Sequence, residues 1–140
     1  MNESVDVIAS ELNAKLLVPR GKHDHERAKA AVKAGFPAIE PVLYELLEWM
    51  QDMNWPVARV LSPMLASVGL PIVPHLRRIF ETDDEIWKYW IIGEILEESR
   101  QVTEALLPEL EQIMLAPTPA LIAEELDVQV KELLEKHGLI

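Results

Sequence analysis

The chain has 140 residues, of which 49% are hydrophobic and 26% charged, and its formal net charge is −11. This length and apolar content predict a single globular domain over residues 1–140, and the lack of cysteine excludes disulfides and thiolate metal sites. An acidic chain repels phosphate groups, so we expect no nucleic-acid partner. No apolar stretch approaches the roughly 20 residues that a membrane-spanning helix requires, and we expect a cytoplasmic protein with no membrane partner.

Helical periodicity and the absence of sustained alternation predict an all-helical chain without a sheet. In chain order, we expect a lone helix at 3–15, helix pairs at 23–34 with 38–52, 55–67 with 71–81 and 84–98 with 103–115, and a last helix at 119–137. Asn54, Thr82 to Glu85, and Thr118 are typical of helix starts. The helix that contains Trp87 is apolar on nearly all sides and should therefore be covered on several of them.

Three prolines, Pro41, Pro74 and Pro108, open similar phrases that are 33 and 34 residues apart. A leucine follows each proline two residues later, and a fixed period of this size is typical of stacked helical pairs. Proline suits the first turn of a helix because the N–H it lacks would have no partner there. We therefore predict an all-α, HEAT-like right-handed α-solenoid of about three helix pairs with an extra helix at each end.

Charge is distributed unevenly along this predicted solenoid. Residues 1–80 hold nine Lys/Arg and nine Asp/Glu, whereas residues 81–140 hold four Lys/Arg and fifteen Asp/Glu. Much of this excess belongs on the outer face of the last helix, since the end of a repeat array needs a polar surface. We interpret the excess chiefly as a charge that keeps the protein in solution.

Several local strings are more specific than the proline phrases. They are Lys22-His23-Asp24, Asp52-Met53-Asn54-Trp55-Pro56, Gly69 with Pro74-His75, and Asp84-Glu85-Ile86-Trp87-Lys88-Tyr89-Trp90. Together with the helical repeats, they resemble an uncharacterised bacterial family of HEAT-like single-domain proteins, a domain of unknown function. This resemblance covers roughly residues 16–115, and it implies a fold and not an activity.

The segment from His23 to Glu26 is the densest group of side chains that could bind a metal. HEAT-like deoxyhypusine hydroxylases hold iron with His-Glu dipeptides on several repeats, and His25-Glu26 is the one such dipeptide here. Adjacent residues on a helix point in different directions, and Asp24 and Glu26 also suit the positive end of a helix dipole. We predict no metal and no cofactor. A metal-dependent HEAT-like enzyme using His23, His25 and Glu26 stays an alternative.

The repeat register indicates which side chains of the second helices share one face. These candidate binding residues are Tyr44, Glu48, His75, Arg77 and Arg78. An alternative is that Arg77 and Arg78 pair with acidic neighbours, for which the candidates are Glu45, Glu48 and Glu111. The favoured function is a module that binds a protein or peptide and is not an enzyme. A narrower version is an inhibitor or immunity-type protein whose acidic face binds a basic partner.

Overall fold

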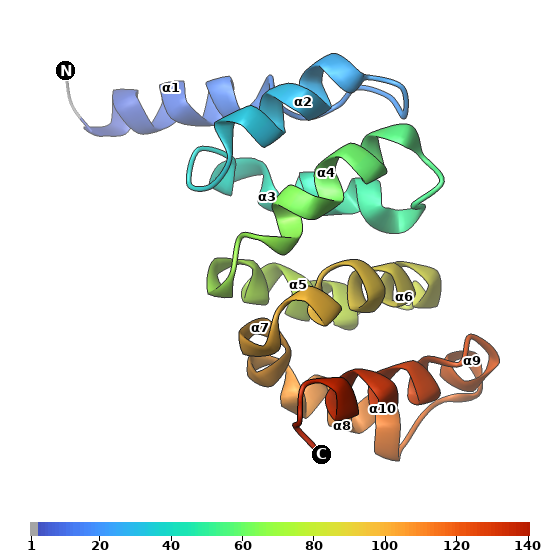
Figure 1. The fold of residues 1–140 in the computed structure, drawn as a ribbon. Coiled ribbons are helices and arrows are strands. Elements are labelled where there is room, and N and C mark those ends of the chain that lie inside the picture. The colour runs from blue at the N-terminus through green and yellow to red at the C-terminus, as the bar shows by residue number, and fades with distance from the viewer. Residues whose placement is uncertain (1–2) are drawn as a thin grey trace. The chain divides into compact units, whose positions relative to one another are not determined.

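The computed structural model describes the backbone of residues 3–140 and the side chains of residues 8–140. Over this part of the chain every regular element is a helix, and no strand is formed (Figure 1). None of the described helices is long and apolar enough to cross a membrane. The chain divides into two compact units, Met1–Met64 and Leu65–Ile140, which are called here the first and the second unit.

The first unit begins with the two predicted helices α1 and α2 and continues with a run of short helical segments. Its elements are α1 (Glu3–Lys15), α2 (His25–Ala34), η1 (Glu40–Val42), α3 (Leu43–Glu48), η2 (Trp49–Gln51) and most of α4 (Pro56–Ala66). The prediction for 38–52 is therefore right in kind, although 3-10 turns flank a short α-helix. Leu43, Leu46, Leu47 and Met50 are fully buried on the inner face of this run.

The second unit contains more and shorter helices than expected. Its elements are η3 (Leu70–Ile72), α5 (Val73–Phe80), α6 (Glu85–Glu94), η4 (Leu96–Glu98), α7 (Arg100–Ala105), α8 (Leu107–Leu115), α9 (Pro119–Ala123) and α10 (Leu126–Lys136). Within this unit α10 packs against α8 and α6. Its polar outer face is present as predicted, since Lys131, Glu132 and Glu135 are exposed while Val130, Leu133 and Leu134 are buried.

The helices predicted at 103–115 and 119–137 are each divided into two α-helices. Helix 103–115 is divided between α7 and α8 because Pro108 lacks an N–H and its ring crowds the carbonyl four residues earlier. Helix 119–137 is divided at Glu125, whose φ of 58° is left-handed and ends α9. No glycine or proline marks this second break in the sequence, and the helical pattern runs through it.

The three phrase prolines lie where the repeat predicts. Pro41, Pro74 and Pro108 each occupy the first turn of a helical segment, in η1, α5 and α8 respectively. The expected cap at Thr118 is also confirmed, since its hydroxyl accepts the Leu121 N–H at 3.3 Å. These first turns fix the start of each segment at the predicted register.

Two other helix starts depend on aspartates. Asp84 caps α6 by accepting the Trp87 N–H at 3.0 Å, which confirms the start expected there. Asn54 does not cap the next helix, because α4 begins at Pro56 and the position before it is Trp55. The Asp52 carboxylate instead accepts the Asn54 N–H at 2.8 Å and shapes the turn that leads into α4.

Burial along α6 differs from the expectation in one respect. Trp87, Ile91 and Ile92 are buried, but Ile86 and Tyr89 are 44% and 41% exposed, so one side of the helix faces solvent. Trp87 is also the one tryptophan in the buried core, since the other three are half-buried. Lys88, which interrupts the apolar run in the sequence, is buried as well.

Candidate functional site

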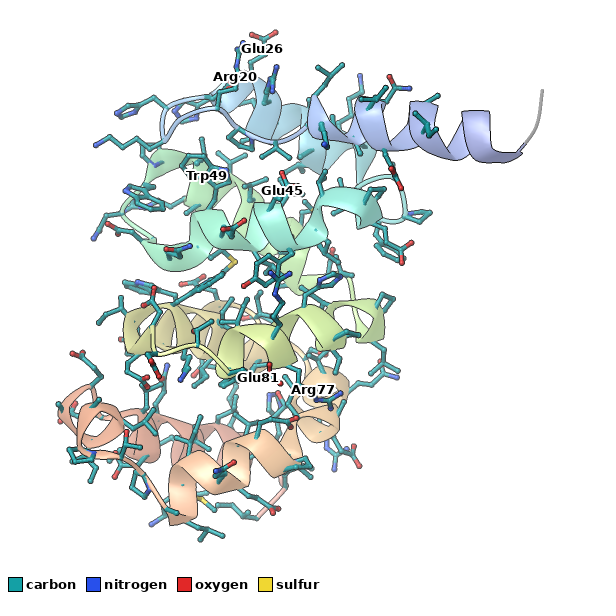
Figure 2. The ribbon with its side chains drawn as sticks, turned by 180° about the vertical axis from the view of Figure 1, so that it is seen from behind. Arg20, Glu26, Glu45, Trp49, Arg77 and Glu81 are labelled. Carbon is teal, nitrogen blue, oxygen red and sulfur yellow. The ribbon has the colours of Figure 1, made fainter. Side chains whose placement is uncertain are left out.

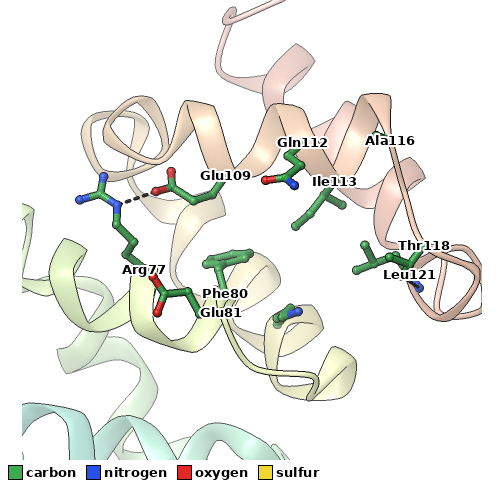
Figure 3. A pocket seen from close by; sticks show the side chains of 10 residues that line it. Arg77, Phe80, Glu81, Glu109, Gln112, Ile113, Ala116, Thr118 and Leu121 are labelled. Atoms are coloured by element: carbon green, nitrogen blue, oxygen red, sulfur yellow. Dashed lines mark hydrogen bonds and ion pairs between the residues drawn. The ribbon is translucent and has the colours of Figure 1, made fainter.

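A pocket of about 410 Å³ lies in the second unit between α5, α6 and α8 (Figure 3). It is called here the α5–α8 pocket. Its lining residues are Arg77, Phe80 and Glu81 from α5, Lys88 from α6, Glu109, Gln112 and Ile113 from α8, and Ala116, Thr118 and Leu121 beyond them. The lining of the pocket therefore combines charged, amide and apolar side chains.

One end of the α5–α8 pocket is closed by an ion pair between helices. Arg77 Nε donates to Glu109 Oε1 at 2.5 Å, and Arg77 Nη2 donates to the Ala105 carbonyl at 3.1 Å (Figure 3). Arg77 does pair with an acidic neighbour, but that neighbour is Glu109 in the first turn of α8 and not one of the three glutamates expected. Both residues follow a phrase proline, so the repeat register brings them together.

A second ion pair lies deeper in the wall of the pocket. Of the charged residues that the structure describes, Lys88 alone is buried, with a side chain 8% exposed. Its Nζ donates to Glu85 Oε1 at 3.1 Å, and the Glu85 side chain is 14% exposed. Glu85 lies in the first turn of α6, where the helix dipole favours a negative charge. Removing this pair from water costs energy that the pairing only partly recovers.

The floor of the α5–α8 pocket is apolar. The Phe80 ring extends from α5 toward α8, and Ile113 points from α8 into the same space (Figure 3). Ile113 and Leu121 are each 7% exposed, and Phe80 is half-buried. Thr118 contributes a hydroxyl to the lining, but this hydroxyl caps α9 by accepting the Leu121 N–H. The pocket is thus suited to hold a group with an apolar body and a polar end.

The structure places the five candidate binding residues in different surroundings. Arg77 lines the α5–α8 pocket. His75 and Arg78 lie on the same helix, one half-buried and one exposed, and neither lines that pocket. Tyr44 is half-buried and Glu48 is exposed on α3 of the first unit.

Sequence reasoning missed Phe80 and Lys88 as pocket residues. Phe80 is an apolar residue at the end of an amphipathic helix, a pattern that indicates ordinary packing. Lys88 is the single basic residue in a long apolar helix, with an acid three residues before it. This spacing places the two side chains on one face and is the signal that could have revealed the pair.

A second pocket, of about 310 Å³, lies in the first unit and is called here the tryptophan pocket. Its lining residues are Val18, Pro19, Glu45, Glu48, Trp49 and Trp55. The two indole rings meet edge to face, with centroids 5.5 Å apart and planes at 73°. Glu45 and Trp49 lie along the same side of the α3–η2 segment (Figure 2). Glu48 is therefore the predicted binding residue that lines a pocket in this unit.

The segment from His23 to Glu26 begins helix α2. Asp24 Oδ1 accepts the Arg27 N–H at 3.3 Å, and Asp24 Oδ2 accepts from Arg20 N at 3.0 Å and Arg20 Nε at 3.2 Å. The hydrogen bond from the Arg20 backbone is the largest cause that lowers the pKa of the Asp24 carboxyl below its usual 3.8. Across the described side chains, no three His, Cys, Asp or Glu residues are grouped so that they could hold a metal ion.

Comparison with known families identifies the family of this chain. Residues 17–134 match the family described as Domain of unknown function (DUF5071), and the chain therefore belongs to that family. This membership confirms the resemblance to an uncharacterised family. Comparison with curated proteins finds no match to the chain.

Proposed function

We propose that this protein binds a protein or peptide partner and that the α5–α8 pocket receives a side chain of that partner. The observation that carries the proposal is a buried ammonium group, Lys88, in the wall of an open pocket whose floor is apolar. A few polar groups placed on an apolar lining are what orient a bound ligand in protein sites. A volume of about 410 Å³ accommodates one large side chain together with its backbone.

Lys88 defines the polar group that such a partner would present. An ammonium carries three donors, and Glu85 accepts one of them. The Lys88 ammonium forms no other hydrogen bond with the described residues. A carbonyl or carboxylate oxygen near the apolar floor would satisfy a further donor. The partner group therefore has an apolar body against Phe80 and an acceptor oxygen at Lys88.

The remaining parts of the proposal concern the wider molecule. We propose that the helix pairs follow a HEAT-like right-handed solenoid, supported by the proline spacing of 33 and 34 residues. The predicted contacts of this protein with its partner also include Tyr44, Glu48, His75, Arg77 and Arg78.

A basic partner is favoured by charge, because the second unit holds six Lys/Arg and fifteen Asp/Glu. An inhibitor or immunity-type protein would use such an acidic surface to bind a basic partner. A cytoplasmic location is supported by the lack of cysteine.

The proposal is tested by filling the pocket. Purified protein is used to select binders from a random peptide library, and the affinity of the enriched peptides is measured by calorimetry. Ala116 lines the pocket and is exposed, so Ala116→Trp places an indole in the cavity. We expect this variant to bind the selected peptides at least about tenfold more weakly than the unchanged protein.

The matched control is Ala123→Trp, which adds the same ring at an exposed alanine of α9 that does not line the pocket. It should bind the peptides as the unchanged protein does. Equal weakening in both variants, or enriched peptides that bind Ala116→Trp normally, would contradict the assignment of the pocket. Failure to enrich any peptide would contradict the binding function itself.

A further inference from the structure

We infer that the tryptophan pocket of the first unit binds an arginine side chain of a protein or peptide. This site is separate from the α5–α8 pocket and rests on different residues, so either proposal can fail without the other. Three features of the pocket carry the inference. They are its aromatic walls, its unpaired carboxylates and its unused indole N–H groups.

The aromatic walls come from two residues brought together by the turn that precedes α4. Trp49 and Trp55 are both half-buried, and their rings meet at 73° with centroids 5.5 Å apart. In this edge-to-face arrangement the ring that offers its edge keeps its own faces clear of the other ring. An indole face attracts cations more strongly than any other aromatic side chain. Val18 and Pro19 add apolar surface suited to the methylene stem of a long basic side chain.

Two carboxylates stand beside these rings without a partner among the described side chains. Glu45 precedes Trp49 by one helical turn, and Glu48 is its neighbour in sequence. Both glutamates are exposed, and within residues 8–140 neither forms a hydrogen bond or an ion pair. Two negative charges beside half-buried indole rings favour an external cation.

Two arginines of this unit reach the loops beside the tryptophan pocket, and main-chain carbonyls hold both of them. Arg27 Nη1 donates to the Val18 carbonyl at 3.3 Å, and Arg59 Nε donates to the Met53 carbonyl at 3.2 Å. Main-chain carbonyls thus hold these two guanidinium groups, which form no ion pair with Glu45 or Glu48. No basic side chain within residues 8–140 forms an ion pair with Glu45 or Glu48, so the pocket suits a cation from another molecule.

The geometry favours arginine over lysine. A guanidinium is planar, so it can stack on an indole while its fork of N–H groups meets a carboxylate, and it is less strongly hydrated than an ammonium. The indole N–H groups of Trp49 and Trp55 form no hydrogen bond with the described residues. Both indoles are half-buried, and a peptide carbonyl next to the bound arginine would supply an acceptor for an indole N–H.

The test uses N-acetyl-arginine amide as a probe and follows the four tryptophan indole signals of the ¹⁵N-labelled protein by NMR. Single Trp→Phe variants assign the signals. We expect the signals of Trp49 and Trp55 to shift and saturate in the millimolar range, where one side chain supplies a few kcal/mol. The citrulline analogue, which has the same shape without the charge, should cause no saturable shift. The lysine analogue should bind more weakly than arginine.

A pair of charge variants separates this site from general attraction of cations. Glu45→Gln with Glu48→Gln should weaken arginine binding at least about threefold, because each exposed ion pair contributes up to about 1 kcal/mol. Glu26→Gln removes an exposed charge of the same unit outside the pocket and should leave binding unchanged. The inference is overturned if citrulline or lysine binds as well as arginine, if only Trp87 and Trp90 respond, or if the double variant binds like the Glu26→Gln control.

Discussion

In the second unit, the two basic residues that line the α5–α8 pocket are each paired with a glutamate, Arg77 with Glu109 and Lys88 with Glu85. In the first unit, the two glutamates of the tryptophan pocket have no partner among the described residues. The second unit is nevertheless the more negatively charged of the two. It holds six Lys/Arg and fifteen Asp/Glu, whereas the first unit holds seven and nine. The charge balance of a region therefore does not reveal where an unpaired carboxylate lies. Packing decides it.

The same contrast separates two uses of charge. A pair such as Lys88 and Glu85 gives up its hydration and then depends on its partner, so it contributes to the shape of the pocket wall. An exposed carboxylate such as Glu45 keeps its hydration and contributes little to folding, so it is free to meet a ligand. Substitutions in the two pockets should therefore have very different effects on stability.

The largest effect is expected at the buried ammonium. Lys88→Met keeps the length of the side chain but leaves Glu85 without its partner in a site that is only 14% exposed. Removing one member of a buried pair costs about 3–5 kcal/mol, and the residual exposure of Glu85 places the expected loss near the lower end. The free energy of unfolding, measured with urea, should fall by about 3 kcal/mol.

Two further variants show whether the loss of stability in Lys88→Met comes from the broken ion pair. Adding Glu85→Gln to Lys88→Met removes the orphaned charge and should recover a large part of the loss. Arg100→Met disrupts an exposed pair, whose side chains are 55% and 54% exposed, and should cost no more than about 1 kcal/mol. A loss in Lys88→Met as small as in Arg100→Met would mean that the second unit does not depend on its buried pair.

The helices were predictable from the sequence because their signals are local. The prolines of the phrases set the first turns, and Asp84 and Thr118 set two caps. The sequence prediction nevertheless ran helix 103–115 across Pro108, although the same proline rule places a helix start there. The break at Glu125 had no local signal at all, since its left-handed backbone is adopted by an ordinary residue.

The pockets were less predictable than the helices because they depend on contacts between elements. Arg77 was expected to line a binding surface and does line a pocket, but its pairing with Glu109 needed the packing of α5 against α8. The turn between Trp49 and Trp55 leaves both half-buried with their rings in contact, and periodicity does not report such a turn.

A smaller effect is expected at Asp24, the paired carboxylate of the first unit. Its pKa is lowered in the folded protein, so its charge stabilises the fold above its usual pKa of 3.8, and this contribution is lost as the pH falls through the lowered value. Asp24→Asn keeps an acceptor for the Arg27 N–H but loses the charge. The melting temperature of the unchanged protein should exceed that of the variant at neutral pH, and the difference should shrink below about pH 4.

The control for this pH dependence is Asp83→Asn. Asp83 is exposed in the second unit and has no hydrogen bond or ion pair with the described residues. Its substitution should give a difference in melting temperature that stays nearly constant over the same pH range. A constant difference for Asp24→Asn as well would show that the arginine at position 20 does not favour the ionised form.

The smallest effect on stability is expected where the further inference places a ligand. Glu45→Gln with Glu48→Gln removes two charges, yet neither side chain is paired within residues 8–140, so the free energy of unfolding should change by less than about 0.5 kcal/mol. Urea unfolding measures this change beside Lys88→Met under the same conditions. A loss above about 1 kcal/mol would show that these carboxylates stabilise the first unit, and the contrast between the two pockets would then fail. A binding site predicts unchanged stability together with weaker arginine binding, because the two carboxylates then interact with the ligand and not with the rest of the protein.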